Sequence, residues 1–206
     1  MTDPDKAETI SQSIIKKIDT IKIDGDSFLW YDLSQVSSTI DAAVELAKNG
    51  CSSWTLVTAD HQNEGRGTHG RDWIVPCGKG LLLSLVVPLP DKPRCLEDLS
   101  TLTAGILIEC LNEYFDLPFK IKHPNDIILR GRKLAGIMYE SVSCGENVLS
   151  LILGMGINLY QTREEFMNSG LPDAISLFCE AGFVPDRERL IFSFLKRFKK
   201  TYEKLC

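Results

Sequence analysis

Apolar residues along the chain form two kinds of pattern: short unbroken runs, and longer stretches with an apolar residue at every third or fourth position. The runs predict β-strands at residues 28–31, 54–59, 81–87, 119–122, 127–130, 134–140 and 148–154. The helical spacing predicts helices over about residues 8–21, 38–49, 99–114 and 191–202. Ser38 or Thr39 is expected to cap the second helix, and Gly131 is expected to turn a hairpin between two strands.

These elements predict a single domain over residues 1–206, in which helices pack against a mixed sheet. A chain of 206 residues is long enough to bury one sizeable core. Residues 60–72 are polar, rich in glycine and fit neither period, so this stretch is expected to be a loop.

Charge and cysteine usage exclude several classes of protein. The formal net charge is -5, whereas a general nucleic-acid binder needs excess cations, so no nucleic-acid partner is expected. No apolar run is long enough to cross a bilayer and residues 1–17 lack a signal-peptide core, so no membrane association is expected. The seven cysteines form no C-x-x-C pair, which argues against a structural zinc site and favours a reducing cytoplasm.

The loop at residues 65–70 matches G-x-G-x-x-G, the dinucleotide-binding pattern, but its context differs. That pattern needs a helix directly after the glycines, and residues 71–76 have no helical spacing. Arg66 and Arg71 instead place two guanidinium groups among glycines, which suits a loop that closes over an anionic ligand. A surface turn with solvated cations explains the loop alone equally well.

Two further segments carry candidate chemistry. Lys122 ends a predicted strand before Pro124, so it is expected to be held rigidly and to be able to point into a cleft, although a solvated strand end is the commoner case. Lys133 precedes Ala135 and Gly136, whose small size leaves backbone open to a ligand. The glycine-rich segment 154–158 ends another strand and presents an amide side chain.

Taken in order, these motifs resemble those of the biotin–protein ligase family. Residues 62–73 match its loop signature Q-x-x-G-R-G-R-x-G-R-x-W, and residues 122–126 match its K-W-P-N-D motif. Residues 132–137 match R-K-(L/I)-(A/S)-G-I, residues 154–158 match G-x-G-I-N, and residues 38–40 stand where the family has S-T-N. The resemblance covers about residues 28–202 and implies an α+β fold, with the largely antiparallel sheet of the class II synthetase-like biotin/lipoate ligases.

The resemblance implies a two-step reaction with ATP and biotin as substrates and Mg²⁺ as the accompanying ion. The biotin carboxylate attacks the α-phosphate of ATP, and a lysine of an acceptor protein then attacks the acyl carbon and releases AMP. Fixed cations are needed because both steps develop negative charge on oxygen. The implied acceptor is the biotin-carrier domain of a biotin-dependent carboxylase, and a homodimer is left open.

By position in the motifs, Lys122 would lie at the α-phosphate and acyl oxygens, and Arg66 and Arg71 would clamp phosphate. No protein residue is assigned as a metal ligand. The residues expected to bind biotin or the nucleotide are Ser38, Thr39, Gln62, Gly65, Gly67, Thr68, His69, Gly70, Trp73, Asn125, Asp126, Lys133, Gly136 and Asn158. Among these, Ser38, Thr39 and Gln62 would bind biotin, Trp73 would form an apolar wall, and Asn125 and Asn158 would serve the nucleotide and magnesium end.

The chain departs from the family pattern at three positions. Thr68 replaces an arginine, His123 replaces a tryptophan and Ile40 replaces an asparagine. Fewer than about thirty residues precede the first core strand, so no N-terminal helix-turn-helix module is expected. The C-terminal β-barrel cap of the family is expected to be absent or truncated, because the last predicted helix reaches the end of the chain.

Two alternative functions stay open. A lipoate or octanoate ligase or transferase shares this fold, but its R-R-x-(S/T)-G-G-G signature is not found in the chain. A catalytically impaired biotin-binding module is the other alternative, because Ile40 and His123 change the binding motifs.

Overall fold

A computed structural model describes residues 10–11, 13–89, 96–145 and 147–204. Within these residues an eight-stranded sheet has the order β1-β2-β3-β4-β8-β7-β6-β5. All neighbouring strands are antiparallel except β2 and β3, which are parallel, so the predicted mixed, largely antiparallel sheet is confirmed. The strands are β1 (Ile14–Ile23), β2 (Asp26–Val36), β3 (Thr55–Gln62), β4 (Gly80–Val87), β5 (Phe119–Lys122), β6 (Asp126–Leu129), β7 (Arg132–Cys144) and β8 (Asn147–Asn158).

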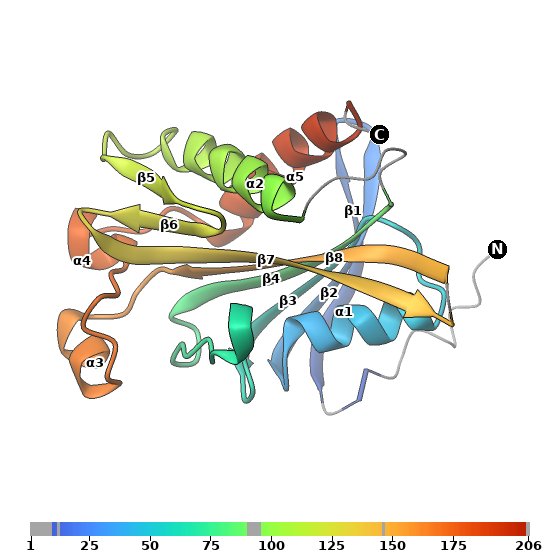
Figure 1. Cartoon of the computed structure of the whole chain (residues 1–206), viewed down its shortest axis with the longest axis horizontal. Helices are drawn as coiled ribbons and strands as arrows, with labels where there is room; N and C mark the ends of the chain where they lie inside the picture. Colours follow the sequence, from blue (N-terminus) through green and yellow to red (C-terminus); the bar gives the residue numbers. More distant parts are fainter. Residues whose placement is uncertain (1–9, 12, 90–95, 146, 205–206) are drawn as a thin grey trace.

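Helices cover both faces of the sheet, with α2 and α5 on one face and α1 on the other (Figure 1). The helices are α1 (Thr39–Lys48), α2 (Leu96–Leu111), α3 (Arg163–Asn168), α4 (Leu177–Ala181) and α5 (Arg187–Tyr202), with a short 3-10 turn, η2 (Thr68–Gly70). The buried core is therefore divided in two. The larger part lies between the sheet and α2 and α5, and the smaller part lies under α1. Among the described residues, no helix is both long and apolar enough to cross a membrane.

The helix predicted over residues 8–21 is wrong, because Ile14–Ile23 forms the edge strand β1. β1 pairs with β2 through a two-residue turn in which Asp24 has φ 52° and Gly25 has φ 90°. An Asp-Gly pair between two apolar runs is a strong hairpin signal, and it outweighs the helical spacing of the isoleucines. The residues before Ile10 lie outside the described part of the chain.

The turn signals at other positions act as expected. Ser38 caps α1, because its side chain accepts a hydrogen bond from the backbone N–H of Ile40. Arg130 and Gly131 both have positive φ and turn the hairpin between β6 and β7, as predicted. The short helices α3 and α4 were not predicted, because six and five residues are too few to show a period.

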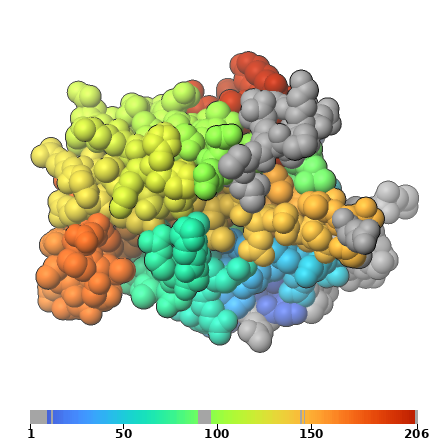
Figure 2. All heavy atoms as spheres, in the orientation of Figure 1, coloured from blue at the N-terminus to red at the C-terminus, as the bar shows by residue number. Residues whose placement is uncertain are grey.

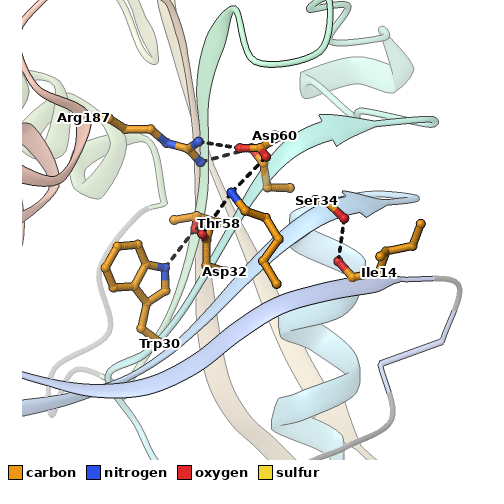
Figure 3. Close-up of polar contacts among 9 residues, drawn as sticks. Ile14, Trp30, Asp32, Ser34, Thr58, Asp60 and Arg187 are labelled. Carbon is orange, nitrogen blue, oxygen red and sulfur yellow. Dashed lines mark hydrogen bonds and ion pairs between the residues drawn. The ribbon is translucent and has the colours of Figure 1, made fainter.

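A polar network ties the N-terminal hairpin to the last helix (Figure 3). Asp60 on β3 accepts hydrogen bonds from Lys16 at 3.0 Å and from Arg187 at 2.8 Å. Lys16 also pairs with Asp32, which accepts a hydrogen bond from the hydroxyl of Thr58. These contacts hold β1, β2, β3 and the start of α5 together. Arg187 and Asp60 are far apart in the sequence, so this link is a tertiary contact.

Candidate functional site

The floor of the candidate site is a trough of glycines on the α1 face of the sheet. Residues paired across neighbouring strands share a face, and every second residue along a strand returns to it. Two such rows form the floor, namely Leu82, Gly156 and Gly136 in one and Ser84, Gly154 and Met138 in the other. Since three of these six positions have no side chain, the sheet surface is hollowed where Gly136 of β7 and Gly154 and Gly156 of β8 lie.

Two large side chains from other elements lie in this trough. A β-carbon on Gly156 would lie 2.4 Å from Cε2 of Trp73, and one on Gly154 would lie 2.5 Å from Cδ1 of Ile40. Real β-carbons do not approach heavy atoms so closely, so each glycine is required by the side chain above it. Trp73 therefore covers one end of the trough and Ile40 the other.

A chain of hydrogen bonds runs along the Ile40 end. Ser84 donates to the hydroxyl of Thr39 at 2.9 Å, and that hydroxyl donates to Gln62 Oε1, also at 2.9 Å. The backbone N–H of Thr39 donates to the same oxygen at 2.8 Å. Because the oxygen of Gln62 is occupied, its NH₂ group is the part left to face a ligand, and it would donate to a ligand oxygen.

The loop from Gly65 to Trp73 closes on itself beside the trough. The backbone N–H of Trp73 donates to Gly65 O and that of Gly67 donates to Arg71 O, both at 2.7 Å. Arg71 donates from Nε to Thr68 O and from Nη2 to the Thr68 hydroxyl. Gly65 has no room for a side chain, because a β-carbon there would lie 2.4 Å from Trp73 O. The loop stands over the α1 face of the molecule (Figure 2).

Arg66 is oriented by two carboxylates. Its Nη2 atom pairs with Asp41 in the first turn of α1 and with Glu140 on β7, the latter at 3.0 Å. Both pairs are partly solvated, so each contributes little to stability. Their effect is to hold the guanidinium at the edge of the trough, among the residues that line it.

Two clefts open on either side of Trp73. The first has about 420 Å³ of space, its open mouth included, and is lined by Thr39, Ile40, Gln62, Arg66 and the glycines of the floor. The second has about 640 Å³, its open mouth included, and its lining includes Arg71, Ile74, Asn158 and Leu171. Four residues line both clefts, namely Gly67, Thr68, Trp73 and Lys133. A ligand with two parts of different chemistry would occupy both clefts and pass Lys133 between them.

Lys133 is held at this junction from three sides. Its ammonium pairs with Asp126 at 2.7 Å and lies 5.4 Å from the centre of the Trp73 ring. Its backbone N–H donates to Asp173 O, and its carbonyl accepts from the N–H of Ile175, so the segment after α3 is bound to β7. The side chain is about one third exposed, which leaves the ammonium open to a ligand.

Several predicted site residues lie together in the two clefts. Those that line at least one cleft are Thr39, Gln62, Arg66, Gly67, Thr68, Arg71, Trp73, Asn125, Lys133, Gly136 and Asn158. Asn158 accepts a hydrogen bond from Gln161 at 2.8 Å, and Asn125 reaches the Thr68 hydroxyl at 3.5 Å. Six predicted residues line neither cleft. They are Ser38, Gly65, His69, Gly70, Lys122 and Asp126.

Lys122 lines neither of the two clefts in this structure, so its predicted role in the site stays a prediction. Lys122 does end a strand, as predicted, but the strand is β5 at the edge of the sheet, and the lysine is exposed. By register, Lys122 pairs with Asp126 and Asp126 pairs with Gly136, so the lysine lies two strands beyond the trough. Two strand spacings amount to about 10 Å, so Lys122 lies on the same face of the sheet as the trough but outside both clefts.

Some lining residues were not assigned to the site from the sequence, although several of them lie within the quoted motifs. They are Leu82, Ile137, Met138, Gly154, Met155 and Gly156 in the first cleft and Asp72, Ile74, Leu171 and Ala174 in the second. Gly154 and Gly156 carried a usable signal, because two glycines at a spacing of two on one strand open the same face. Leu171 and Ala174 carried none, because a loop that packs back from a distant segment has no local pattern.

Comparisons with known proteins show the family to which this chain is similar. A model of the biotin/lipoate A/B protein ligase family matches residues 33–158, more than half of the chain. The chain is 34% identical over 201 residues to the bifunctional ligase/repressor BirA of Bacillus subtilis (strain 168), which covers 96% of this chain and 60% of that protein. It is 32% identical over 162 residues to the biotin–[acetyl-CoA-carboxylase] ligase of Paracoccus denitrificans, which covers 77% of this chain and 67% of that protein.

A solved structure shows the same fold. The biotin protein ligase from Aquifex aeolicus in complex with biotin and ATP matches with a TM-score of 0.73 and 28% identity. The match covers 85% of this chain and 70% of that one. The expected biotin/lipoate ligase fold is therefore confirmed, although the chain spans only 60% of the length of the Bacillus relative. The chain belongs to the biotin/lipoate A/B protein ligase family.

Proposed function

We propose that this chain is a biotin–protein ligase, which activates biotin with ATP to biotinyl-5'-AMP and transfers biotin to a lysine of a carrier domain. The observation that carries the proposal is the pair of clefts that meet at Lys133 and Trp73. One cleft is small and has a polar end, which suits a compact acid. The other is larger and bears Arg71 and Asn158, which suits a nucleotide.

The polar end of the first cleft favours biotin over a fatty acid. A ureido group has a carbonyl oxygen to accept from the NH₂ of Gln62, and its N–H groups can donate to the hydroxyl of Thr39. Octanoate and lipoate carry no polar group at that end of the molecule. Either would bury Gln62 and Thr39 against hydrocarbon without hydrogen bonds to the ligand, which is unfavourable.

The first chemical step would take place where the clefts join. A carboxylate oxygen of biotin attacks the α-phosphorus, forms the new P–O bond and expels pyrophosphate. Lys133 lies at that junction, so its ammonium would offset the negative charge that grows on the phosphoryl oxygens. Arg71, on the loop that borders the second cleft, would bind the phosphates, and the closed loop would keep water from the mixed anhydride.

The second step breaks the bond between the acyl carbon and the phosphate oxygen. The neutral amine of the acceptor lysine attacks the acyl carbon, AMP leaves with the bonding electron pair, and the amine loses a proton. Lys133 would again face the oxygen on which charge develops. Arg66 would act at the edge of the first cleft, where Asp41 and Glu140 hold it, so its assignment as a phosphate clamp stays a prediction.

Magnesium would accompany the nucleotide and need not be held by a protein cage. Among the described residues, no three His, Cys, Asp or Glu side chains gather closely enough to hold a metal ion. Phosphate oxygens and water satisfy most of the coordination of Mg²⁺ in nucleotide sites. The amides of Asn125 and Asn158 are the neutral groups on this chain that line the clefts near the expected phosphates.

The partner belongs to the same proposal. The acceptor would be the biotin-carrier domain of a biotin-dependent carboxylase, in the reducing cytoplasm that the cysteine pattern favours. A homodimer is compatible with the open edge strands of the sheet, and size-exclusion chromatography with light scattering would measure it directly.

Pyrophosphate release from ATP tests the function against both alternatives. The purified chain is mixed with ATP, magnesium and one acid at a time, namely biotin, lipoate or octanoate, and pyrophosphate is measured. Release with biotin alone supports the proposal, whereas release with lipoate or octanoate shows that the chain is the other kind of ligase. Biotin binding by calorimetry without pyrophosphate release would identify an impaired binding module. Transfer is then followed as the mass gain of an added carrier domain.

A further inference from the structure

An apolar residue beside the polar end of the first cleft is one at which this chain departs from the family pattern. Ile40 follows Thr39 in the first turn of α1, and it is buried with 5% exposure. Its side chain lies over Gly154, within the row of Ser84, Gly154 and Met138. Ile40 therefore lines the cleft directly beside the hydrogen-bonded chain of Ser84, Thr39 and Gln62.

Ile40 leaves no room for a side chain on residue 154. A β-carbon on Gly154 would lie 2.5 Å from Cδ1 and 2.8 Å from Cγ1 of Ile40, and only then 3.3 Å from Cγ of Met138. Both atoms of closest approach belong to Ile40, so the length of residue 40 is the main limit on the space above residue 154, and Met138 is a weaker one. Ile40 is also β-branched and helical, which leaves it few alternative rotamers.

We propose that Ile40, seated on Gly154, sets the size limit at the head-group end of the acid-binding cleft. The inference deepens the proposed function and rests on it, because it assumes that the polar chain binds the ureido head of biotin. Ile40 bounds that head with a rigid aliphatic wall. An acid with one additional alkyl group at its head is therefore disfavoured by contact with residue 40, in addition to the loss of any hydrogen bond that the alkyl group removes.

The first test reverses the size limit by shortening residue 40. Binding of biotin, and of biotin methylated on either ureido nitrogen, is measured by calorimetry for the full chain and for Ile40→Ala. Methylation removes an N–H donor in both proteins, so only the change in the ratio of affinities reports the wall. We expect the ratio of the affinity for biotin to the affinity for one methylated isomer to fall by about tenfold or more in Ile40→Ala. An affinity ratio that is unchanged for both isomers would overturn the inference.

Val44→Ala provides the matched control. Val44 lies one turn further along α1 and packs against the same core cluster, but it does not line either cleft. It loses aliphatic atoms from the same helix, so it reproduces any loosening of α1. We expect the affinity ratio of the full chain to be retained in Val44→Ala. The same fall in both variants would trace the effect to helix loosening and contradict a wall at residue 40.

The second test adds a side chain at residue 154, where Ile40 leaves no room for one. Gly154→Ala alone should displace Ile40 and weaken biotin binding about tenfold or more. Adding Ile40→Ala removes both clashing atoms, so the double variant should bind biotin better than Gly154→Ala. Independent, additive effects would overturn the inference. If Gly154→Ala does not fold, restored folding in the double variant reports the same coupling.

A failed function and a failed size limit are distinguishable. If the unaltered chain does not bind biotin, the proposed function is wrong. The melting temperatures of the two single variants and the double variant then still measure the coupling between residues 40 and 154 without any ligand. If the unaltered chain binds biotin and the variants behave additively, only the size limit is wrong.

Discussion

The indole of Trp73 lies on Gly156, so closely that a β-carbon at residue 156 would come within 2.4 Å of the ring. Trp73 belongs to the loop that follows β3, whereas Gly156 lies in β8, more than eighty positions later. This contact places the indole between the two clefts and next to Lys133. The side chain that separates the acid from the nucleotide is thus positioned by a glycine on the sheet.

Gly156→Ala should therefore displace Trp73 and impair adenylation. Overpacking of this kind costs about 1–3 kcal/mol, which corresponds to roughly a tenfold to hundredfold effect. The measurement is pyrophosphate release with biotin, together with tryptophan fluorescence. Gly105→Ala in α2 is the control, because no heavy atom lies within 4 Å of a β-carbon there and a helix tolerates alanine. Full activity in Gly156→Ala would show that the position of Trp73 is not required.

Lys133 and Lys122 can be ranked by mutation. Lys133 lies at the junction of the clefts and Lys122 lies outside both, so Lys133→Met should lower the rate of adenylation by about a hundredfold or more. Lys122→Met should lower it less. Both rates are measured by rapid-quench pyrophosphate release, and circular dichroism checks that each variant is folded. A larger loss in Lys122→Met would show that β5 moves towards the ligand and that the family-based assignment is the correct one.

Thr68→Arg tests how the loop retains its intermediate. Thr68 now serves as a hydrogen-bond acceptor for Arg71, and it lacks the cation that the family pattern has at this position. A charge-assisted hydrogen bond contributes about 1.5–3 kcal/mol, so the arginine should slow release of biotinyl-adenylate roughly tenfold or more. Stopped-flow dissociation of the adenylate from both proteins measures this. Equal or faster release from Thr68→Arg would contradict the prediction.

Asp60 should make stability depend on pH. Burial acts to raise the pKa of Asp60, but hydrogen bonds from Lys16 and Arg187 outweigh it and hold the pKa below its ordinary value. A carboxyl group with a depressed pKa stabilises the fold fully above its unfolded pKa of about 3.9. That contribution is lost as the pH falls through the lower, folded pKa.

Asp60→Asn should accordingly lower the free energy of unfolding at pH 7 by about 1–2 kcal/mol, measured by urea denaturation. The difference from the unaltered chain should shrink as the pH falls below about 4, because the carboxyl group is protonated first in the unfolded chain and only at lower pH in the folded chain. Asp19→Asn is a control, because Asp19 is exposed and its contacts are with its near neighbours Lys17 and Thr20. A difference that is constant from pH 7 to pH 3 would show that charge is not the cause.

Sequence patterns predicted most of the elements, because their signals are local. The buried run of β4 and the capped helix α1 depend on residues close in the chain, and both were placed within one or two residues. The same patterns failed at β1, where isoleucines at helical spacing occur in a strand. The Asp24-Gly25 turn was the better signal, because it constrains backbone angles and not only side-chain order.

The sequence by itself determined which residue types are available to the site and in what order. Its arginines among glycines indicated an anionic ligand, and the family resemblance implied biotin and ATP. Only the tertiary structure decided which of them meet. Lys133 and Lys122 both belong to motifs that match the family pattern. Lys133 lies where the clefts meet, whereas cross-strand register places Lys122 two strands away from the trough. Register, and the contacts of Ile40 and Trp73 with distant glycines, are long-range properties that no local pattern encodes.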